Sequence, residues 1–276
     1  MVVFQQNVGR ARTSLDQLLQ HINEATSGSN TITSIINNHN SNNNNNNHHN
    51  KDHVILVQEP YTVCDLIDPV PGYSVFYCQT DGRPRSAVLV PSHINAILIS
   101  QHSDRDIVTV ALTDFALKVV SVYIPPPVPR QTPPHLNRLN ELESVTNEQK
   151  VLIGGDFNGH NTVWGSASDD ERGNSVYDLA GSLNLHILND GIMTTFYTHR
   201  EFAGVPRLLS SHVDLTMVSR HLLPSVQSWQ VIDKDTGSDH RIIETRFAFS
   251  RPSTRPAAYQ STRRYITRNV DWSLFS

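Results

Sequence analysis

The 276 residues suffice for one large α/β domain or two small ones, and the 38% hydrophobic content suffices for a core. The net charge of −4 and the pI of about 6.4 exclude a global basic field, so any contact with nucleic acid has to come from local patches. Cys64 and Cys78 have neither close spacing nor a paired histidine, which argues against a zinc site or a disulfide framework and favours a reduced intracellular compartment.

The amino-terminal part predicts a strand, a helix and an insertion, and it has no signal-peptide pattern. Residues 2–4 can start a strand that ends at the polar residues before Val8, and Thr13 or Ser14 can cap an amphipathic helix. Residues 37–50 contain ten Asn, three His and one Ser, so they have nothing to bury and predict a disordered insertion. No run in the chain reaches the length of a membrane span, so we expect no membrane partner.

Short apolar runs dominate the next part of the chain. Residues 54–58 predict a central strand that ends in the carboxylate of Glu59 and is stopped by Pro60. Five β-rich runs with turn signals between them then predict antiparallel hairpins. These runs cover residues 73–78, 86–90, 94–99, 107–112 and 117–123. The last one ends at Tyr123, whose side chain is either a third polar group at a strand end or simple core packing.

The stretch 151–161 is the one around which the other segments are organised. Its apolar start predicts a buried strand, and Gly154 and Gly155 loosen the backbone at the strand's end. Asp156 and Asn158 follow two residues apart, so both can project from one face. An Asp beside an Asn suits the activation of a water molecule. Gly-Asp-x-Asn-Gly is also good turn chemistry, and the stretch alone leaves both readings open.

The remaining segments alternate between helices, strands and polar loops. We expect helices at 134–146 and 174–183, with a solvated acidic loop at 169–171 before the second. Residues 193–198 predict a short strand followed by a polar loop, and 211–218 alternate as a half-buried strand does. Further strands are expected at 228–233 and 241–249, with a turn at 236–240 between them. We expect residues 1–249 to form one domain and 250–276 a basic linker toward a downstream domain.

Eight polar side chains fall at these strand ends, and together they suit phosphoester chemistry. They are Asn7, Glu59, Tyr123, Asp156, Asn158, Asp214, Asp239 and His240. Glu59 offers a carboxylate to Mg²⁺, and Asp156 can take a proton from an attacking water. His240, oriented by Asp214, can stabilise charge on a phosphoryl oxygen. The alternative, a turn or a cap, has to be invoked separately for each strand end.

The ordered set of motifs resembles the endonuclease/exonuclease/phosphatase superfamily of divalent-metal phosphoesterases, over roughly residues 2 to 249 apart from the insertion. The motifs are Asn7, Gln58-Glu59-Pro60, Tyr123, Gly155-Asp156-Phe157-Asn158, Val213-Asp214 and Ser238-Asp239-His240. The stretch Gly155 to Asn161 with Trp164-Gly165 resembles the apurinic-type endonuclease domains of non-LTR retrotransposons. Gly9 departs from repair-type abasic endonucleases, which carry Asp there, and this favours the retrotransposon branch.

The resemblance implies a DNase I-like four-layer α/β sandwich, with two packed mixed β-sheets flanked by helices. It implies a Mg²⁺-dependent nick in DNA, with Mn²⁺ as a possible substitute, that leaves a 3′-hydroxyl to prime reverse transcription. It further implies a nuclear location, with element RNA and a downstream reverse transcriptase domain as partners.

The resemblance also implies a role for each matched residue. Asn7, Glu59 and Asp239 would lie on the metal side. Asp156 would be the base and Asn158 its orienting partner. Tyr123 would contact the phosphate, with Thr195 nearby, and Asp214 would orient His240.

Two other functions stay open at the level of sequence. The same fold could act on a small phosphoester such as a phosphoinositide, although the residues around Trp164 argue against this. Alternatively, the chain could be a transposon-derived fragment that binds DNA without catalysis, although all the expected catalytic positions are intact.

Overall fold

A computed structural model describes most of the chain in one continuous fold. The described residues are 1–27, 52–79, 82–126, 142, 145–146, 150–202 and 204–249. The predictions for the insertion 37–50, for most of the helix 134–146 and for the tail 250–276 lie outside these residues. No helix among the described residues has both the length and the apolarity needed to cross a bilayer.

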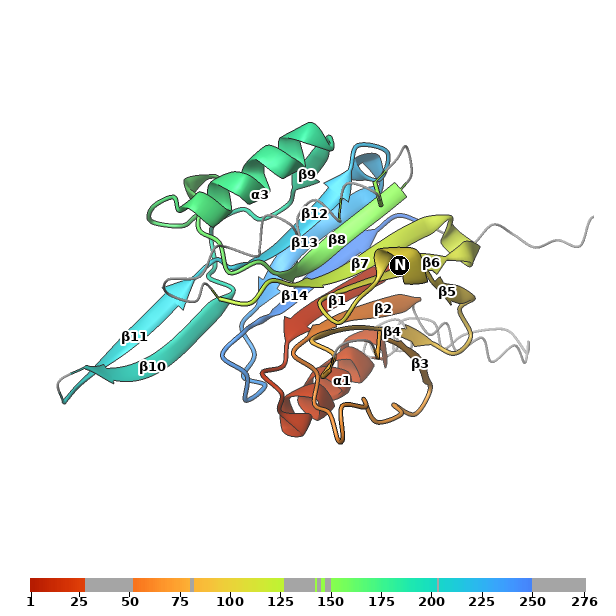
Figure 1. Ribbon diagram of the computed structural model, residues 1–276, viewed down its shortest axis with the longest axis horizontal. Coiled ribbons are helices and arrows are strands. Elements are labelled where there is room, and N and C mark those ends of the chain that lie inside the picture. The colour runs from red at the N-terminus through yellow and green to blue at the C-terminus, as the bar shows by residue number, and fades with distance from the viewer. Residues whose placement is uncertain are drawn as a thin grey trace, which may run out of the picture.

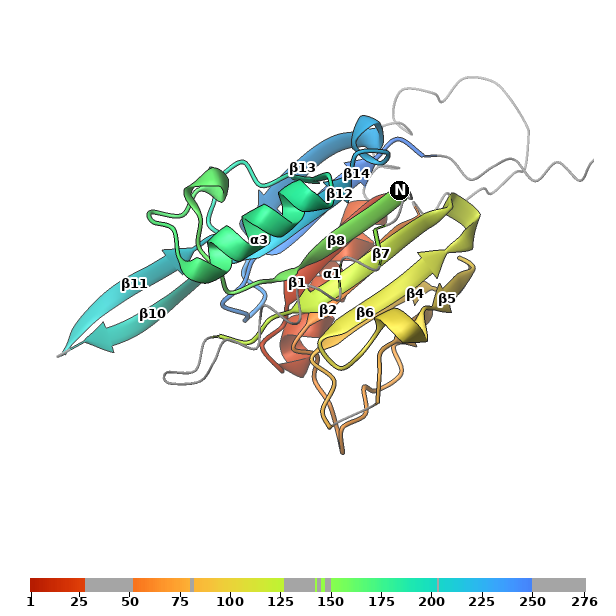
Figure 2. The ribbon, with the colours of Figure 1, turned by 45° about the horizontal axis from the view of Figure 1, so that its top comes forward.

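Two six-stranded mixed sheets form the centre of the molecule (Figures 1 and 2). The first sheet has the order β13-β14-β1-β2-β4-β3, with only β1 and β2 parallel. Its strands are β1 Val2–Asn7, β2 His53–Gln58, β3 Tyr73–Phe76, β4 Ser86–Pro91, β13 Val226–Ile232 and β14 Ile242–Phe247.

The second sheet has the order β5-β6-β7-β8-β12-β9, with only β7 and β8 parallel. Its strands are β5 Ala96–Leu98, β6 Ile107–Leu112, β7 Leu117–Tyr123, β8 Lys150–Asp156, β9 Leu185–Ile187 and β12 Asp214–Ser219. The expected hairpins are present within each sheet, but the chain passes from the first sheet to the second between β4 and β5.

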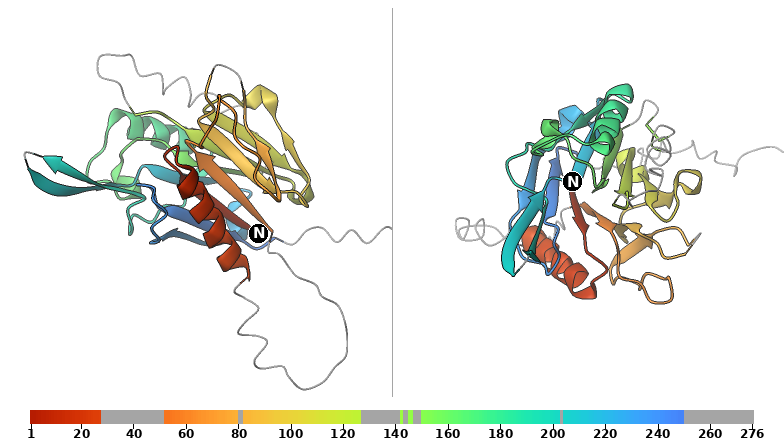
Figure 3. Two further views of the ribbon diagram at one scale, coloured as in Figure 1. Left: turned by 90° about the horizontal axis from the view of Figure 1, so that it is seen from below. Right: turned by 60° about the vertical axis from the view of Figure 1, so that its left-hand side comes forward.

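Among the described residues, two helices, four short 3₁₀ turns and a separate two-stranded sheet complete the regular structure. Helix α1 Arg12–Ser27 packs on the outer face of the first sheet, and α3 Glu171–Ser182 packs on the outer face of the second (Figure 3). The 3₁₀ turns are η2 Ser100–His102, η3 Thr113–Phe115, η4 Thr162–Trp164 and η5 Leu223–Ser225. The order helix, sheet, sheet, helix confirms the four-layer sandwich expected from the sequence.

Three apolar clusters explain why the strands read as unbroken apolar runs. One cluster fills the space between the sheets, for example with Leu56 and Leu152. The others lie under the helices, where Phe4 meets α1 and Ile153 faces α3. Most central strands are therefore buried on both faces, as residues 54–58 are in β2.

Four local predictions were wrong, each because tertiary contacts decided the outcome. Helix α1 begins at Arg12, so Thr13 and Ser14 lie inside it instead of capping it. The acidic loop 169–171 is not simply solvated, because Asp170 caps α3 by accepting a hydrogen bond from the Gly173 backbone nitrogen at 2.6 Å.

The other two errors concern the segment that follows β9. The expected polar loop after residue 198 is a hairpin of β10 Phe196–Phe202 and β11 Val205–Ser211. Strand β12 is buried on both faces instead of one, because it is paired between β8 and β9 inside the second sheet. The three-residue β9 carries too short a pattern for the sequence to have predicted it.

The space between the two sheets changes from apolar to polar along the strands. On β8 the inward positions are Leu152, Gly154 and Asp156, two residues apart. In the middle, Gln5 hydrogen-bonds the Gly155 carbonyl oxygen, and a Cβ on Gly154 would lie only 2.4 Å from the Gln5 Oε1 atom. The side chains between the two sheets are therefore polar at the edge where β8 ends.

Candidate active site

The strand registers bring the predicted residues to one edge of the sandwich. In the second sheet Tyr123, Asp156 and Asp214 are direct neighbours across β7, β8 and β12. In the first sheet Asn7 ends β1, and Glu59 follows the end of β2. The side chains of Asn7, Tyr123, Asp156 and Asp214 continue the inward faces of their strands. Glu59 has the parity of the outward residues Ile55 and Val57, and its left-handed backbone redirects it toward the cluster. Five separate segments therefore meet at this edge.

Asp156 lies at the centre of this cluster and is 2% exposed. Its Oδ2 atom accepts a hydrogen bond from the Asn7 amide nitrogen at 3.0 Å and lies 3.9 Å from the Nε2 atom of His240. Burial and the neighbouring charge of Asp214 raise the pKa of the Asp156 carboxyl, against the opposite effects of His240 and Asn7. A carboxylate with a raised pKa is suited to accept a proton.

His240 is held on the other side of Asp156 by a buried carboxylate. Its Nδ1 atom lies 2.8 Å from the Oδ2 atom of Asp214, and Gln6 donates a hydrogen bond to its carbonyl oxygen at 2.8 Å. Burial lowers the pKa of His240, but the carboxylates of Asp214, Asp156 and Glu59 outweigh it and raise the pKa to about 9. The imidazole is therefore a cation at neutral pH.

Glu59 and Tyr123 line the opposite side of the cluster. Glu59 has a left-handed backbone with φ of 46°, which costs a non-glycine residue about 1–2 kcal/mol. Its carboxylate accepts hydrogen bonds from Arg10 and from the Asn7 amide nitrogen, the latter at 3.5 Å. Burial, then the charges of Glu59 and Asp156, raise the pKa of Tyr123 far above its ordinary value, so its hydroxyl stays protonated.

Asn158 shows that the turn and the site are one feature. Its backbone nitrogen donates to the Asp156 Oδ1 atom at 3.1 Å, which is an Asx turn, and its own φ is 48°. Its side chain donates to the Ile124 carbonyl oxygen at 3.0 Å. The turn thus fixes the direction of the Asp156 carboxylate.

The remaining predicted residues take two different positions. Thr195 is fully buried, and its hydroxyl oxygen accepts a hydrogen bond from the Asp214 backbone nitrogen at 3.0 Å. Asp239 lies in the turn before His240, but its side chain is exposed and no described contact joins it to the cluster. Only its carbonyl oxygen is engaged, by the Tyr197 backbone nitrogen.

The donor set fits a divalent cation. One ligand atom each from Asp156, Asp214 and His240 lie within 4.8 Å of one another. The Oδ1 atom of Asp214 is buried and has no hydrogen-bond partner among the described residues. Oxygens of Glu59 and Asp156 also converge on the Asn7 amide. Mg²⁺ and Mn²⁺ prefer such oxygen-rich sets.

Two positions for a cation thus overlap at Asp156. In the structure, the ligand atoms of Asp156 lie close to those of Asp214 and His240. The resemblance instead placed Asn7, Glu59 and Asp239 on the metal side. A ligating imidazole has to be neutral, and the raised pKa of His240 opposes this. The side of Asp156 that faces Asn7 and Glu59 offers carboxylate and amide oxygens without a histidine.

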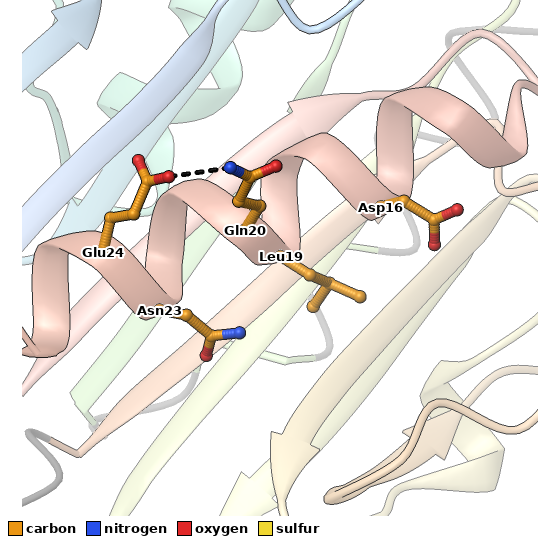
Figure 4. Close-up of a pocket in the computed structure, with 5 residues that line it drawn as sticks. All are labelled: Asp16, Leu19, Gln20, Asn23 and Glu24. Atoms are coloured by element: carbon orange, nitrogen blue, oxygen red, sulfur yellow. Dashed lines mark hydrogen bonds between the residues drawn. The ribbon is translucent and has the colours of Figure 1, made fainter.

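A shallow surface hollow with a volume of about 500 Å³ lies along α1 (Figure 4). Its described lining is Asp16, Leu19, Gln20, Asn23 and Glu24, all on one helix face. None of them belongs to the cluster, so size alone does not identify the functional site.

Several supporting residues were missed at the level of sequence. Asn189 bridges the Asp214 carbonyl oxygen and the Thr216 backbone nitrogen, and Arg172 donates to the Asn158 carbonyl oxygen at 3.2 Å. Arg10 pairs with Glu59. These contacts join residues far apart in the sequence, so no local pattern announced them.

This fold, with polar strand ends meeting at one edge, is that of the DNase I-like AP endonucleases in the endonuclease/exonuclease/phosphatase superfamily. Residues 117–244 match the model of the family described as endonuclease-reverse transcriptase. The resemblance expected from the sequence is confirmed. No curated protein sequence matches the chain.

Solved structures agree with this assignment. The endonuclease domain of TRAS1, a telomere-specific non-LTR retrotransposon, is 26% identical with a TM-score of 0.66, covering 91% of this chain and 99% of that domain. An AP endonuclease from Archaeoglobus fulgidus is 14% identical with a TM-score of 0.60, covering 90% and 100%. The 3′ phosphatase NExo from Neisseria, bound to product DNA hairpin, is 13% identical with a TM-score of 0.56, again covering 90% and 100%.

Proposed function

We propose that the chain is a Mg²⁺-dependent DNA endonuclease that nicks one phosphodiester and leaves a 3′-hydroxyl. The observation that carries the proposal is the position of Asp156 between a His–Asp pair and the Asn7–Glu59 side of the cluster. Asp156 as a base, protonated His240 and a metal position beside Glu59 lie at one polar edge. This combination suits the hydrolysis of a phosphodiester. The match to an endonuclease-reverse transcriptase domain supports DNA as the substrate.

The reaction follows from the charge states of the residues. Asp156 takes a proton from water, whose oxygen forms a bond to phosphorus while the bond from phosphorus to the 3′-oxygen breaks. The 3′-oxygen leaves with the electron pair of that bond and takes up a proton from solvent to become the 3′-hydroxyl. Asn158 fixes the Asp156 carboxylate through its backbone nitrogen. Protonated His240, held by Asp214, stabilises the negative charge that grows on the phosphoryl oxygens. The protonated Tyr123 hydroxyl and Thr195 are proposed to contact the phosphate.

Glu59 and Asn7, with Asp239 at the rim, are proposed to hold the cation. A bound Mg²⁺ would supply positive charge at the phosphate. In the structure the Glu59 carboxylate accepts hydrogen bonds from Asn7 and from Arg10, whose side chain is 50% exposed.

The 26% identity to the TRAS1 domain supports a further proposal about context. The nick would prime reverse transcription of a non-LTR retrotransposon, in the nucleus and together with element RNA and a downstream reverse transcriptase domain. The resulting 3′-hydroxyl has to be extendable by a polymerase for this role.

A plasmid-nicking assay tests the function directly. Supercoiled DNA incubated with the protein and Mg²⁺ should relax to the open circle, and a polymerase should extend the nicks without further treatment. EDTA should abolish the reaction. Phosphate release from a small phosphoester without plasmid nicking would favour the phosphatase alternative, and DNA binding without either reaction would favour the non-catalytic one.

A further inference from the structure

An ion pair joins the two sheets directly beside the cluster. Arg85 precedes β4 in the first sheet, and Asp106 precedes β6 in the second. The guanidinium donates from Nε and Nη2 to the two carboxylate oxygens of Asp106, a bidentate contact. The Asp106 side chain is 1% exposed and that of Arg85 is 18% exposed.

Each partner of this pair also holds the strand end of a site residue. The Glu59 backbone nitrogen donates to the Arg85 carbonyl oxygen at 2.8 Å, and the Tyr123 backbone nitrogen donates to the Asp106 carbonyl oxygen at 2.8 Å. The guanidinium carbon of Arg85 lies 5.4 Å from the centroid of the Tyr123 ring. Burial raises the pKa of the Tyr123 hydroxyl and the charge of Glu59 raises it further, so the two side chains interact electrostatically.

We propose that Arg85 and Asp106 form a cross-sheet clamp that sets the separation of Glu59 from Tyr123, and thereby aligns the cation side of the site with the phosphate side. The inference rests on the proposed function. Both are positioning residues, because neither side chain contacts Asp156 or His240 in the described contacts.

The chemistry of the pair explains why arginine stands at this position. A bidentate guanidinium–carboxylate contact fixes both distance and plane, whereas a lysine ammonium fixes only a point contact. The buried Asp106 carboxylate also lies 3.6 Å from the Nε atom of Arg105, so replacing Arg85 removes the bidentate contact without leaving the carboxylate unpaired. Positioning of this kind matters because an error of about 1 Å can cost roughly 100-fold in rate.

The test compares Arg85→Lys and Arg85→Met with a matched pair elsewhere in the first sheet. Arg246 makes a similar bidentate contact to Glu244, which is 2% exposed, on β14. Arg246→Met should lower the melting temperature without changing kcat for plasmid nicking. Arg85→Lys should lower kcat about 10- to 100-fold and raise the half-saturating Mg²⁺ concentration. Its KM for DNA should stay within about two-fold of wild type.

Three outcomes would overturn the clamp. Wild-type kcat in folded Arg85→Lys would show that the bidentate contact is not needed. An unchanged kcat with a raised KM and a salt slope reduced by about one would make Arg85 a phosphate contact instead. Equal loss of kcat in Arg246→Met would reduce the effect to general stability. If wild-type protein fails to nick DNA, the proposed function fails first.

Asp106→Glu provides a second variant in case the arginine variants do not fold. It keeps the charge but adds a methylene, so it should shift Glu59 relative to Tyr123 and lower kcat while circular dichroism stays native. Wild-type kcat in folded Asp106→Glu would equally overturn the clamp.

Discussion

The candidate site and the β10–β11 hairpin adjoin each other but are built in opposite ways. Asp156 and Asp214 are 2% and 1% exposed on strands buried inside a six-stranded sheet. The hairpin forms a sheet of its own two strands and projects away from the body (Figure 1), with Val205 56% and Leu208 59% exposed. A rigid core fixes groups for chemistry, whereas a projecting ribbon can meet a large partner.

The hairpin starts directly at the site. Phe196 bridges to His240 in the backbone, with ring centroids 4.9 Å apart, and Thr195 holds Asp214. Further out, Arg200 and Arg207 are directly opposite each other in the register. Two arginines side by side on a projecting ribbon are a candidate contact for the phosphates of DNA in the proposed function.

Asp156→Asn should produce the largest effect, a loss of nicking rate without a loss of DNA affinity. Removal of the base is expected to lower the rate of nicking about 1,000-fold, within the usual range for general-base catalysis. Affinity for DNA should change little, because the hairpin is intact. Rates from plasmid relaxation and affinities from fluorescence anisotropy measure the two effects.

Asp178→Asn, an exposed change on α3, is the matched control and should keep wild-type activity. Circular dichroism should show a melting temperature for Asp156→Asn within about 4 °C of wild type, which corresponds to about 1 kcal/mol. Residual nicking above a tenth of the wild-type rate would remove Asp156 from the role of base.

The combination of Arg200→Ala and Arg207→Ala should produce the opposite pattern. Loss of two phosphate contacts is expected to raise KM about 10-fold and to reduce the salt slope of DNA binding by about two, with kcat within about three-fold. Arg12→Ala with Arg220→Ala, both exposed on other parts of the surface, is the control. An unchanged salt slope would mean that the hairpin does not follow the DNA backbone.

A pH titration of stability in EDTA should give a smaller effect, confined to His240. Its pKa is raised from 6.5 to about 9, so the folded state binds the proton more tightly than the unfolded state. The stabilisation is full below pH 6.5 and is lost as the pH rises through about 9. The melting temperature of wild type should therefore fall over this range relative to His240→Gln.

Asp214→Asn tests the cause of that pH dependence, since Asp214 provides the largest favourable contribution to the raised pKa of His240. The variant should lose most of the difference between pH 6.5 and 9. Parallel melting curves for wild type and His240→Gln at every pH would contradict the assignment.

Much of the sandwich was predictable because its strands carry their own signal. Residues 107–112 and 117–123 were predicted with the bounds of β6 and β7, since a strand buried on both faces reads as an unbroken apolar run. The choice of polar residues at the ends of predicted strands also identified most of the residues that form the candidate site. The choice succeeded because inward positions recur every second residue, so Leu152, Gly154 and Asp156 share one face.

The supporting contacts were not predictable, for a physical reason. Arg85 and Asp106 stand in turns of ordinary composition, and their pairing depends on the packing of two sheets. A strand was predicted at residues 193–198, but the rest of the hairpin was interpreted as a loop because exposed strands lack the apolar alternation that identifies a strand. Asp239 and His240 are neighbours in sequence, yet only the His240 side chain turns toward Asp214.

The smallest effect on nicking and stability is expected from replacing the Asn-rich insertion, which has no apolar side chain and no Asp, Glu, Lys or Arg. Residues 37–50, with their ten Asn, contain no apolar side chain to bury, and they stand between α1 and β2 in the sequence. Their replacement by a short Gly-Ser linker should leave kcat, KM and the melting temperature near wild type. Scrambling the same residues is the control, since it keeps length and composition. A large loss of nicking with the linker but not with the scrambled tract would assign a role to the length or composition of the insertion, and a loss with both would assign one to its order.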